Sequence, residues 1–365
     1  VVVVVGWLYI VPQLQGAALT IRITTGLPAW VGSTSVVLVV CLSVVAGGMR
    51  SITFVQAFQF WLKLTALAVP VLFIIFTLAG NGSAPVAPAV VNPTGLAPAG
   101  PYQNISLLVA LLFGTLGLPH VLVRFYTNPD GHSARRTTLI VLGLLSVFYL
   151  FPTACGLLGR MFAPELARSG RSDAVVLLLP GKLIGGTAGD LLSALVVAGA
   201  FAAFLSTTSG LVVSLAGVIS QDVLGGGVRG FRLAAIVSAV VPLGFALMSD
   251  SLALAGSVGL VFAFTASTVC PVLLLGIWWR GLTDAGAIAG MVTGGVLCGG
   301  AMVWGTALGA AGTPFWLAQP AAWTVPAAFA VTVFTSRATR KRIPRTMPRI
   351  MTRLHTPERP LVTER

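Results

Sequence analysis

The chain has 365 residues, of which 56% are hydrophobic and 8% are charged, and its mean hydropathy is +0.96. A soluble domain of this length could not hide so much apolar surface in one core, so the composition excludes a soluble protein and predicts an all-α polytopic membrane protein. The net charge of +13 does not indicate a nucleic-acid partner, because the basic residues lie mainly in short loops and in the carboxyl-terminal tail.

Hydropathy predicts ten membrane-spanning helices along the chain. They cover residues 2–24, 31–47, 53–79, 105–126, 137–160, 188–221, 231–249, 252–278, 285–308 and 318–336. Arginines gather in alternate loops, so the positive-inside rule assigns those loops and both termini of this chain to the cytoplasm. We therefore expect a multi-pass protein of the cell membrane.

The two ends of the chain and one loop have unusual compositions. The chain begins at Val1 with VVVVVGWLYIVP and no charged flank, which predicts either a start at a GTG codon or the downstream part of a longer protein. Residues 80–104 are rich in Pro, Ala and Gly and are expected to form an extended outer loop. The basic, proline-interrupted segment 337–365 is expected to be a disordered cytoplasmic tail that is attracted to anionic membrane lipid.

The third predicted span carries a polar stripe. Gln56, Gln59 and Lys63 fall at i, i+3 and i+7 on an otherwise apolar helix, so they share one face, which we expect to point into the helix bundle. The two glutamines fit either hydrogen bonds between helices or the wall of a substrate cavity. Lys63 fits either the attraction of an anionic substrate or a pairing with a carboxylate or carbonyl group of the protein.

The fourth predicted span is interrupted by the segment GTLGLPHVLVRFYT, residues 114–127. A broken helix exposes backbone groups near the middle of the membrane, where transporters bind substrates and ions, although a proline kink can also serve packing alone. Gly117 and His120 flank the break and are candidates for the cavity wall. Arg124, one turn later, is a candidate gate or a contact to lipid headgroups.

The sixth predicted span contains a cluster of hydroxyl groups near its middle. Ala203, Ser206 and Thr207 stand at i, i+3 and i+4, so a backbone carbonyl and two hydroxyls project from one face of the helix. Three neutral oxygens suit a small hard cation. The alternative is that the hydroxyls bond to carbonyls of their own helix or pack at a contact between helices.

The eighth and ninth predicted spans carry weaker signals. Thr265 and Thr268 precede Pro271 and fit either a cavity wall or bonding to the backbone of their own helix. Gly286, Gly290 and Gly294 recur every four residues, which predicts a face for close helix packing. Because the motifs of metalloproteases, serine hydrolases and nucleotide-binding enzymes are absent from the sequence, we do not expect an enzyme.

Four segments together resemble the solute:sodium symporter family, and within it the cation/acetate, or monocarboxylate, branch. The segments are VAGGMRSITFVQAFQ (45–59), GLPHVLVRFYT (117–127), FLSTTSGLVVSLAGVISQDVL (204–224) and CPVLLLGIWWRGLTDAGAIAGMVTGG (270–295). The resemblance implies a LeuT-like fold of two inverted five-helix repeats with additional helices. The ten predicted spans would be the last ten of the family's usual thirteen, so the first three would be missing.

This resemblance implies a division of the chain into two domains. Residues 1–336 would be the transmembrane transporter domain, and residues 337–365 the tail. Within the former, residues 1–79 would form an incomplete first repeat, residues 105 to about 278 the complete second repeat, and residues 285–336 the additional helices.

The resemblance also implies where ions and substrate bind. The family's sodium site falls on Ala203, Ser206 and Thr207, and Gln56 stands where many members have an aspartate. That glutamine argues against a sugar and for a carboxylate substrate. The remaining candidates for the substrate cavity are Gln59, Gly117, His120, Thr265 and Thr268, with Arg124 as a candidate gate.

The expected function is sodium-coupled symport of a small monocarboxylate such as acetate, propionate or pyruvate, with Na⁺ as the coupling ion. The expected partners are this carboxylate and membrane lipid, and the sequence does not predict the oligomeric state. Three alternatives stay open: a sodium-coupled carrier of another solute such as proline or pantothenate, a proton-coupled monocarboxylate carrier, and a non-transporting fragment of a split gene.

Overall fold

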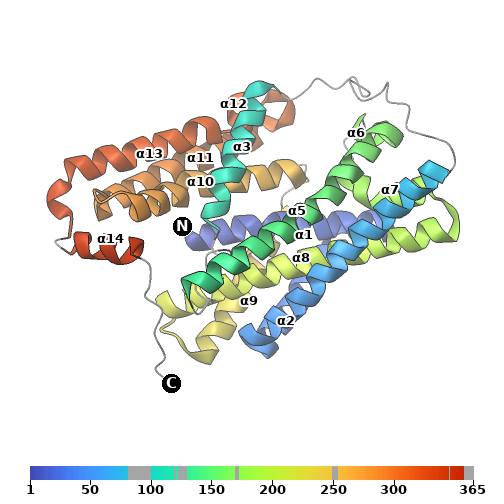
Figure 1. Cartoon of the computed structure of the whole chain (residues 1–365), viewed down its shortest axis with the longest axis horizontal. Helices are drawn as coiled ribbons and strands as arrows, with labels where there is room; N and C mark the ends of the chain where they lie inside the picture. The colour runs from blue at the N-terminus through green and yellow to red at the C-terminus, as the bar shows by residue number, and fades with distance from the viewer. Residues whose placement is uncertain are drawn as a thin grey trace. The chain divides into compact units, whose positions relative to one another are not determined.

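The part of the protein that the computed structural model describes is helical and contains no β-strand; it covers residues 1–80, 100–118, 121, 130–168, 172–248, 254–344 and 346–356. Within it, seven helices or parts of helices are long and apolar enough to cross a membrane, and two shorter apolar helical segments accompany them. The expected all-α polytopic class is therefore confirmed (Figure 1).

The helices, with their bounds, are α1 (Val2–Thr25), α2 (Ala29–Gly80), α3 (Pro101–Leu116), α5 (Gly131–Phe162), α6 (Pro164–Arg168), η2 (Ser172–Ala174), α7 (Val175–Leu183), α8 (Gly186–Asp222), α9 (Gly227–Met248), α10 (Leu254–Trp278), α11 (Asp284–Gly312), α12 (Phe315–Ala318), α13 (Ala321–Ala338), η3 (Arg340–Arg342) and α14 (Met347–His355).

The second and third expected spans are parts of one helix. α2 has 52 residues and continues through Gly47 and Gly48, where a connection between two spans was expected. At about 1.5 Å per residue it is roughly 78 Å long, far more than one crossing of a bilayer requires. The two glycines lower helix propensity by about 1 kcal/mol each, but they keep their backbone N–H groups, so the helix continues through them.

Prolines and glycines stand at the ends of helices in two other expected spans. α3 ends at Leu116, directly before Gly117, whereas the expectation was a span to residue 126; the segment 119–120 and 122–129 lies outside the described residues. The expected span 318–336 agrees with α13 within a few residues at both ends, and Pro320, which lacks a backbone N–H, separates α12 from α13.

The expectation of a disordered tail is wrong for part of residues 337–365. α13 continues to Ala338, η3 follows, and α14 covers Met347–His355. Pro348 stands in the first turn of α14, where a missing N–H costs nothing, so this proline begins a helix and does not break one. Residues 357–365 lie outside the described residues.

The chain divides into two compact units, which do not follow the order of the sequence. Unit 1 comprises Val1–Val5, Ala99–Thr138 and Val258–Arg365, and unit 2 comprises Gly6–Pro98 and Leu139–Ser257. Both units contain exposed apolar side chains on their long helices, as expected of surfaces that face lipid.

Unit 2 is built around α8, which packs against α2, α7 and α9. Leu211 and Leu215 of α8 are fully buried, and the side chain of Leu215 lies so close to Gly6 of α1 that a Cβ there would overlap with it. A Cβ at Gly199 of α8 would likewise overlap with the Cβ of Ala66 of α2. Small residues thus let three long helices approach each other closely.

In unit 1 the three glycines of α11 have the packing role that their spacing predicts. A Cβ at Gly286 or Gly290 would overlap with hydroxyl groups of α13, and a Cβ at Gly294 would overlap with the backbone carbonyl of Ser267 in α10. The hydroxyls of Ser267 and Thr324 lie 2.8 Å apart and connect α10 with α13 in the same core.

Candidate functional site

A hydrogen bond between α2 and α8 places the polar stripe of α2 beside the hydroxyl cluster of α8. The Nε2 group of Gln56 donates to the backbone carbonyl of Ser206 at 2.9 Å, and the same nitrogen would be 3.2 Å from a Cβ at Gly210. Ala66, ten residues after Gln56, meets Gly199, so the two helices run antiparallel. Gln56 therefore makes the contact between helices that was one of its two interpretations.

The three residues of the candidate sodium site share one stretch of α8. Ala203, Ser206 and Thr207 are all half-buried, and Ala203 lines a cavity of about 230 Å³ inside unit 2. In regular helix the carbonyl of residue 203 accepts the backbone N–H of residue 207, so it can offer a cation only its second lone pair, beside the two hydroxyl oxygens. No cation is needed to hold this stretch of α8 in shape, because its backbone is regular helix.

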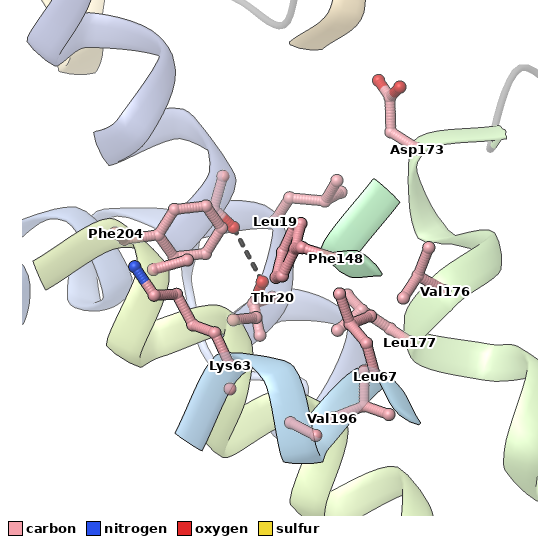
Figure 2. Close-up of a pocket in the computed structure, with 15 residues that line it drawn as sticks. Leu19, Thr20, Lys63, Leu67, Phe148, Asp173, Val176, Leu177, Val196 and Phe204 are labelled. Carbon is pink, nitrogen blue, oxygen red and sulfur yellow. Dashed lines mark hydrogen bonds between the residues drawn. The ribbon is translucent and has the colours of Figure 1, made fainter. Parts of the chain in front are cut away.

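The cavity is lined by five helices of unit 2 and one short turn of helix. Its lining residues come from α1, α2, α5, η2, α7 and α8, and Figure 2 shows them. They are Gly16, Leu19, Thr20, Lys63, Ala66, Leu67, Phe148, Asp173, Val176, Leu177, Val196, Gly199, Ala200, Ala203 and Phe204.

This lining is mainly apolar, with one basic and one acidic side chain. Lys63 extends from α2 on the side of the cavity where Phe204 lies, and Asp173 lies at the opposite end in Figure 2. Thr20 also lines the cavity, but its hydroxyl donates to the carbonyl of Gly16 at 2.8 Å, within α1. Among the described lining residues, charge is thus concentrated at the two ends of an apolar space.

Several polar side-chain atoms of unit 2 are buried without a hydrogen-bond partner in the described part of the chain, and two of them belong to the polar stripe of α2 and the hydroxyl cluster of α8. These two are the Oε1 atom of Gln59 and the hydroxyl of Thr208, whose residue is completely buried. An unsatisfied buried polar group costs about 1–3 kcal/mol, so such positions are often retained for a bound ligand or water. Gln59 was a sequence candidate, whereas Thr208 was not.

The candidates in unit 1 have a different environment. Gly117 ends α3 against α10, where a Cβ would lie 2.7 Å from Cγ2 of Thr265. Thr265 and Thr268 are almost completely buried, and their hydroxyls donate to carbonyls of α10 at 2.9 and 2.8 Å. This bonding within the helix is the second of their two interpretations. His120 and Arg124 lie outside the described residues.

Sequence reasoning missed most of the cavity wall. Thr20, Phe148, Asp173 and Phe204 come from four different elements, and their spacing in the chain carries no signal that they meet. Lys63 could be singled out from the sequence, because it lies in the polar stripe. That Lys63 and Ala203 line the same cavity follows only from the antiparallel packing of α2 and α8.

Comparisons with known proteins agree on one family. The family model described as "Sodium:solute symporter family" matches residues 1–294. Among curated proteins, the "Uncharacterized symporter YwcA" of Bacillus subtilis (strain 168) is 29% identical over 309 residues. The match covers 78% of this chain and 59% of that relative, so this chain spans less than two-thirds of the relative's length.

Proposed function

Because this chain belongs to the sodium:solute symporter family, we propose that the protein is a secondary active transporter that couples sodium movement to uptake of a small monocarboxylate. Acetate, propionate and pyruvate are the substrates with the proposed chemistry. The observation that supports this proposal is that Lys63 and Ala203 line the same cavity. The proposed cation site and an ammonium group would then be neighbours at one cavity.

In this proposal sodium binds on α8. The carbonyl of Ala203 and the hydroxyls of Ser206 and Thr207 are its ligands, as their spacing and the family suggest. Gln56 supports the site indirectly, because its bond to the carbonyl of Ser206 holds α2 in register with α8. Neutral oxygens are the ligands that a hard monovalent cation prefers, since they replace its water shell without binding it irreversibly.

The carboxylate binds at Lys63. Its charge would be costly to bury alone, and the ammonium together with the neighbouring sodium ion offsets that cost. A short alkyl or keto chain then contacts apolar side chains such as Leu67 and Phe148. A second carboxylate would approach Asp173 at the other end of the cavity, which disfavours dicarboxylates.

The binding of sodium and the binding of carboxylate are coupled because the two proposed sites lie close together. Each bound ion lowers the electrostatic cost of binding the other, so sodium and carboxylate favour the same loaded state of the protein. Release on the other side of the membrane then requires the bundles of helices to rearrange, as in other secondary transporters.

The test is uptake of labelled acetate and pyruvate by proteoliposomes that contain the purified protein. We expect an inward sodium gradient to drive accumulation, and a proton gradient without sodium to drive none. Accumulation driven equally by protons alone would replace this proposal with the proton-coupled alternative. Excess unlabelled succinate should not compete with pyruvate, whereas propionate should.

A small amino acid such as proline is the second candidate, and the charges of the cavity favour it specifically. Lys63 at one end could bind its carboxylate and Asp173 at the other its ammonium group. Competition by proline in the same uptake experiment distinguishes the two substrates. Inhibition by proline without inhibition by propionate would favour the amino acid.

A further inference from the structure

Two neighbouring cavities lie at the end of α10 and α13 in unit 1, and both are lined by Arg280. The first has a volume of about 650 Å³ and is lined by Trp279, Arg280, Gly281, Arg337, Arg340 and Ile343. The second has about 370 Å³ and is lined by Trp278, Arg280, Met351, Thr352, His355 and Thr356. We call the two together the arginine–tryptophan pocket.

Hydrogen bonds hold the wall of this pocket in place. The backbone N–H of Thr283, in the turn between α10 and α11, donates to the hydroxyl of Ser336 at 3.3 Å. The hydroxyls of Thr283 and Thr339 lie 2.8 Å apart. These contacts fasten the turn that carries Arg280 to the end of α13, which carries Arg337. The convergence of the arginines is therefore built into the fold of unit 1.

Helix α14, drawn in red in Figure 1, contributes one wall of the second cavity. It is anchored by Met351, which is 4% exposed, and by His355, whose ring lies 5.1 Å from the ring of Trp278. The neighbouring face of α14 leaves Ile350 and Leu354, one turn apart, exposed to the surroundings. α14 is thus a short amphipathic helix with arginines beside an apolar edge.

The charge of the pocket is strongly positive. Three guanidinium groups line it, and among its described lining residues none is acidic. Asp284 is near in sequence, but its carboxylate accepts a hydrogen bond from the N–H of Ala285 at the start of its own helix. Several converging guanidinium forks match the geometry and charge of a phosphate group better than those of a single carboxylate.

The rim of the pocket indicates that this phosphate belongs to a lipid. Trp278 and Ile277 at the end of α10 are 72% and 42% exposed, and α14 adds its own exposed apolar edge. Tryptophan at the end of a membrane helix is typical of the level of the lipid headgroups. A soluble phosphate would use the arginines but leave these apolar surfaces in water.

We propose that the arginine–tryptophan pocket binds the phosphate headgroup of an anionic phospholipid. Arg280, Arg337 and Arg340 contact the phosphate, and the acyl chains follow the apolar surface of Ile277 and Trp278. Basic pockets at the ends of membrane helices are suited to such lipids, beyond the general attraction between basic tails and anionic membranes. This proposal does not depend on the transported substrate.

The experiment is a titration of the detergent-solubilised protein with dioleoylphosphatidylglycerol, observed by native mass spectrometry. We expect the wild-type protein to bind this lipid more tightly than dioleoylphosphatidylcholine. The triple variant Arg280→Gln, Arg337→Gln, Arg340→Gln should bind it at least about tenfold more weakly, since each charge-assisted hydrogen bond contributes about a factor of ten. Arg280→Lys should fall between the two, because it keeps the charge and loses the fork.

The matched control is the triple variant Arg135→Gln, Arg136→Gln, Arg229→Gln, which removes the same charge from exposed positions of α5 and α9. It should bind the lipid as the wild type does. Equal weakening in both triple variants would overturn the proposal in favour of general charge attraction.

Displacement of the lipid by millimolar inorganic phosphate would overturn the proposal in favour of a soluble ligand. If the pocket variant does not fold, equal affinity of the wild type for both lipids would itself contradict a headgroup site.

Discussion

In the proposed function, Lys63 is the residue on which the identity of the substrate depends most. It stands two helical turns after Gln56, whose side chain bonds to α8, and it lines the cavity together with Ala203. A mostly apolar wall screens charge less than bulk water does, so the ammonium group there can exchange its present interaction within the protein for one with a substrate anion. The same position would repel a second cation, so it also affects how tightly sodium binds when the substrate is absent.

We predict that Lys63→Met raises the KM for pyruvate by at least about tenfold, because a charge-assisted hydrogen bond to the carboxylate is lost. The measurement is sodium-driven pyruvate uptake in proteoliposomes. Lys182→Met is the matched control. The side chain of Lys182 is 43% exposed and forms an ion pair with Glu165. The Lys182→Met variant should have the KM of the wild type. A Lys63→Met protein with the KM of the wild type would exclude Lys63 as the carboxylate ligand.

For the proposed sodium site we predict that Thr207→Ala raises the sodium concentration for half-maximal uptake by about tenfold, because one proposed oxygen ligand is removed. The selectivity between acetate and pyruvate should change little. Sodium titrations of uptake, with each substrate in turn, measure both effects. Unchanged activation by sodium would show that the ion binds elsewhere.

Some residue positions could be predicted from the sequence, and others could not. Gln56 and Lys63 share one helix, so their common face follows from the period of 3.6 residues alone. Asp173 and Phe148 belong to separate elements, and only the folded chain brings them to one cavity. For Thr265 and Thr268 the sequence allowed two interpretations, a cavity wall or hydrogen bonds within their own helix. The hydrogen bonds from both hydroxyls to carbonyls of α10 favour the second interpretation.

At the scale of elements, close packing of α11 is the clearest agreement between sequence and structure. The four-residue spacing of glycines predicts a face without side chains, and the facing helices approach until a Cβ would overlap with their atoms. At Gly294 the overlapping atom is the backbone oxygen of Ser267, which cannot rotate away. This contact should therefore tolerate substitution poorly.

We predict that Gly294→Ala lowers the free energy of unfolding by about 1–3 kcal/mol through overpacking. Gly300→Ala on the same helix is the control, because nothing lies within 4 Å of its Cβ position. Higher helix propensity should stabilise that variant by up to about 1 kcal/mol. Thermal unfolding in detergent measures both, and equal melting temperatures would contradict the close contact.

Ends of elements were the least predictable part of the fold. The positions of α1, α8 and α9 agree with the expected spans within a few residues, because long apolar stretches define them. α2 was expected to be two spans, since a glycine pair and Arg50 resemble a connection, but a helix without an internal proline at that place continues. Short α14 was missed because its prolines were interpreted as breaks.

At the scale of the whole molecule, two ions that bind in neighbouring sites must affect each other reciprocally. We predict that saturating sodium increases the affinity for pyruvate, and that saturating pyruvate increases the affinity for sodium by the same factor, about 5–150-fold for a typical coupling. Equilibrium binding of labelled pyruvate and of ²²Na⁺ to the purified protein measures the two factors. Affinities that do not depend on each other would contradict coupling through one cavity.

The sequence by itself determined that this is an all-α membrane protein of the sodium:solute symporter family, because hydropathy and short motifs are properties of contiguous residues. It also placed the polar stripe of α2 and the hydroxyl cluster of α8 on single helix faces. Only the tertiary structure decided that Lys63 and Ala203 share a cavity and that three arginines converge near Trp279. Such contacts depend on how separate helices pack. Packing depends on the fit of many side chains, which a local sequence pattern does not specify.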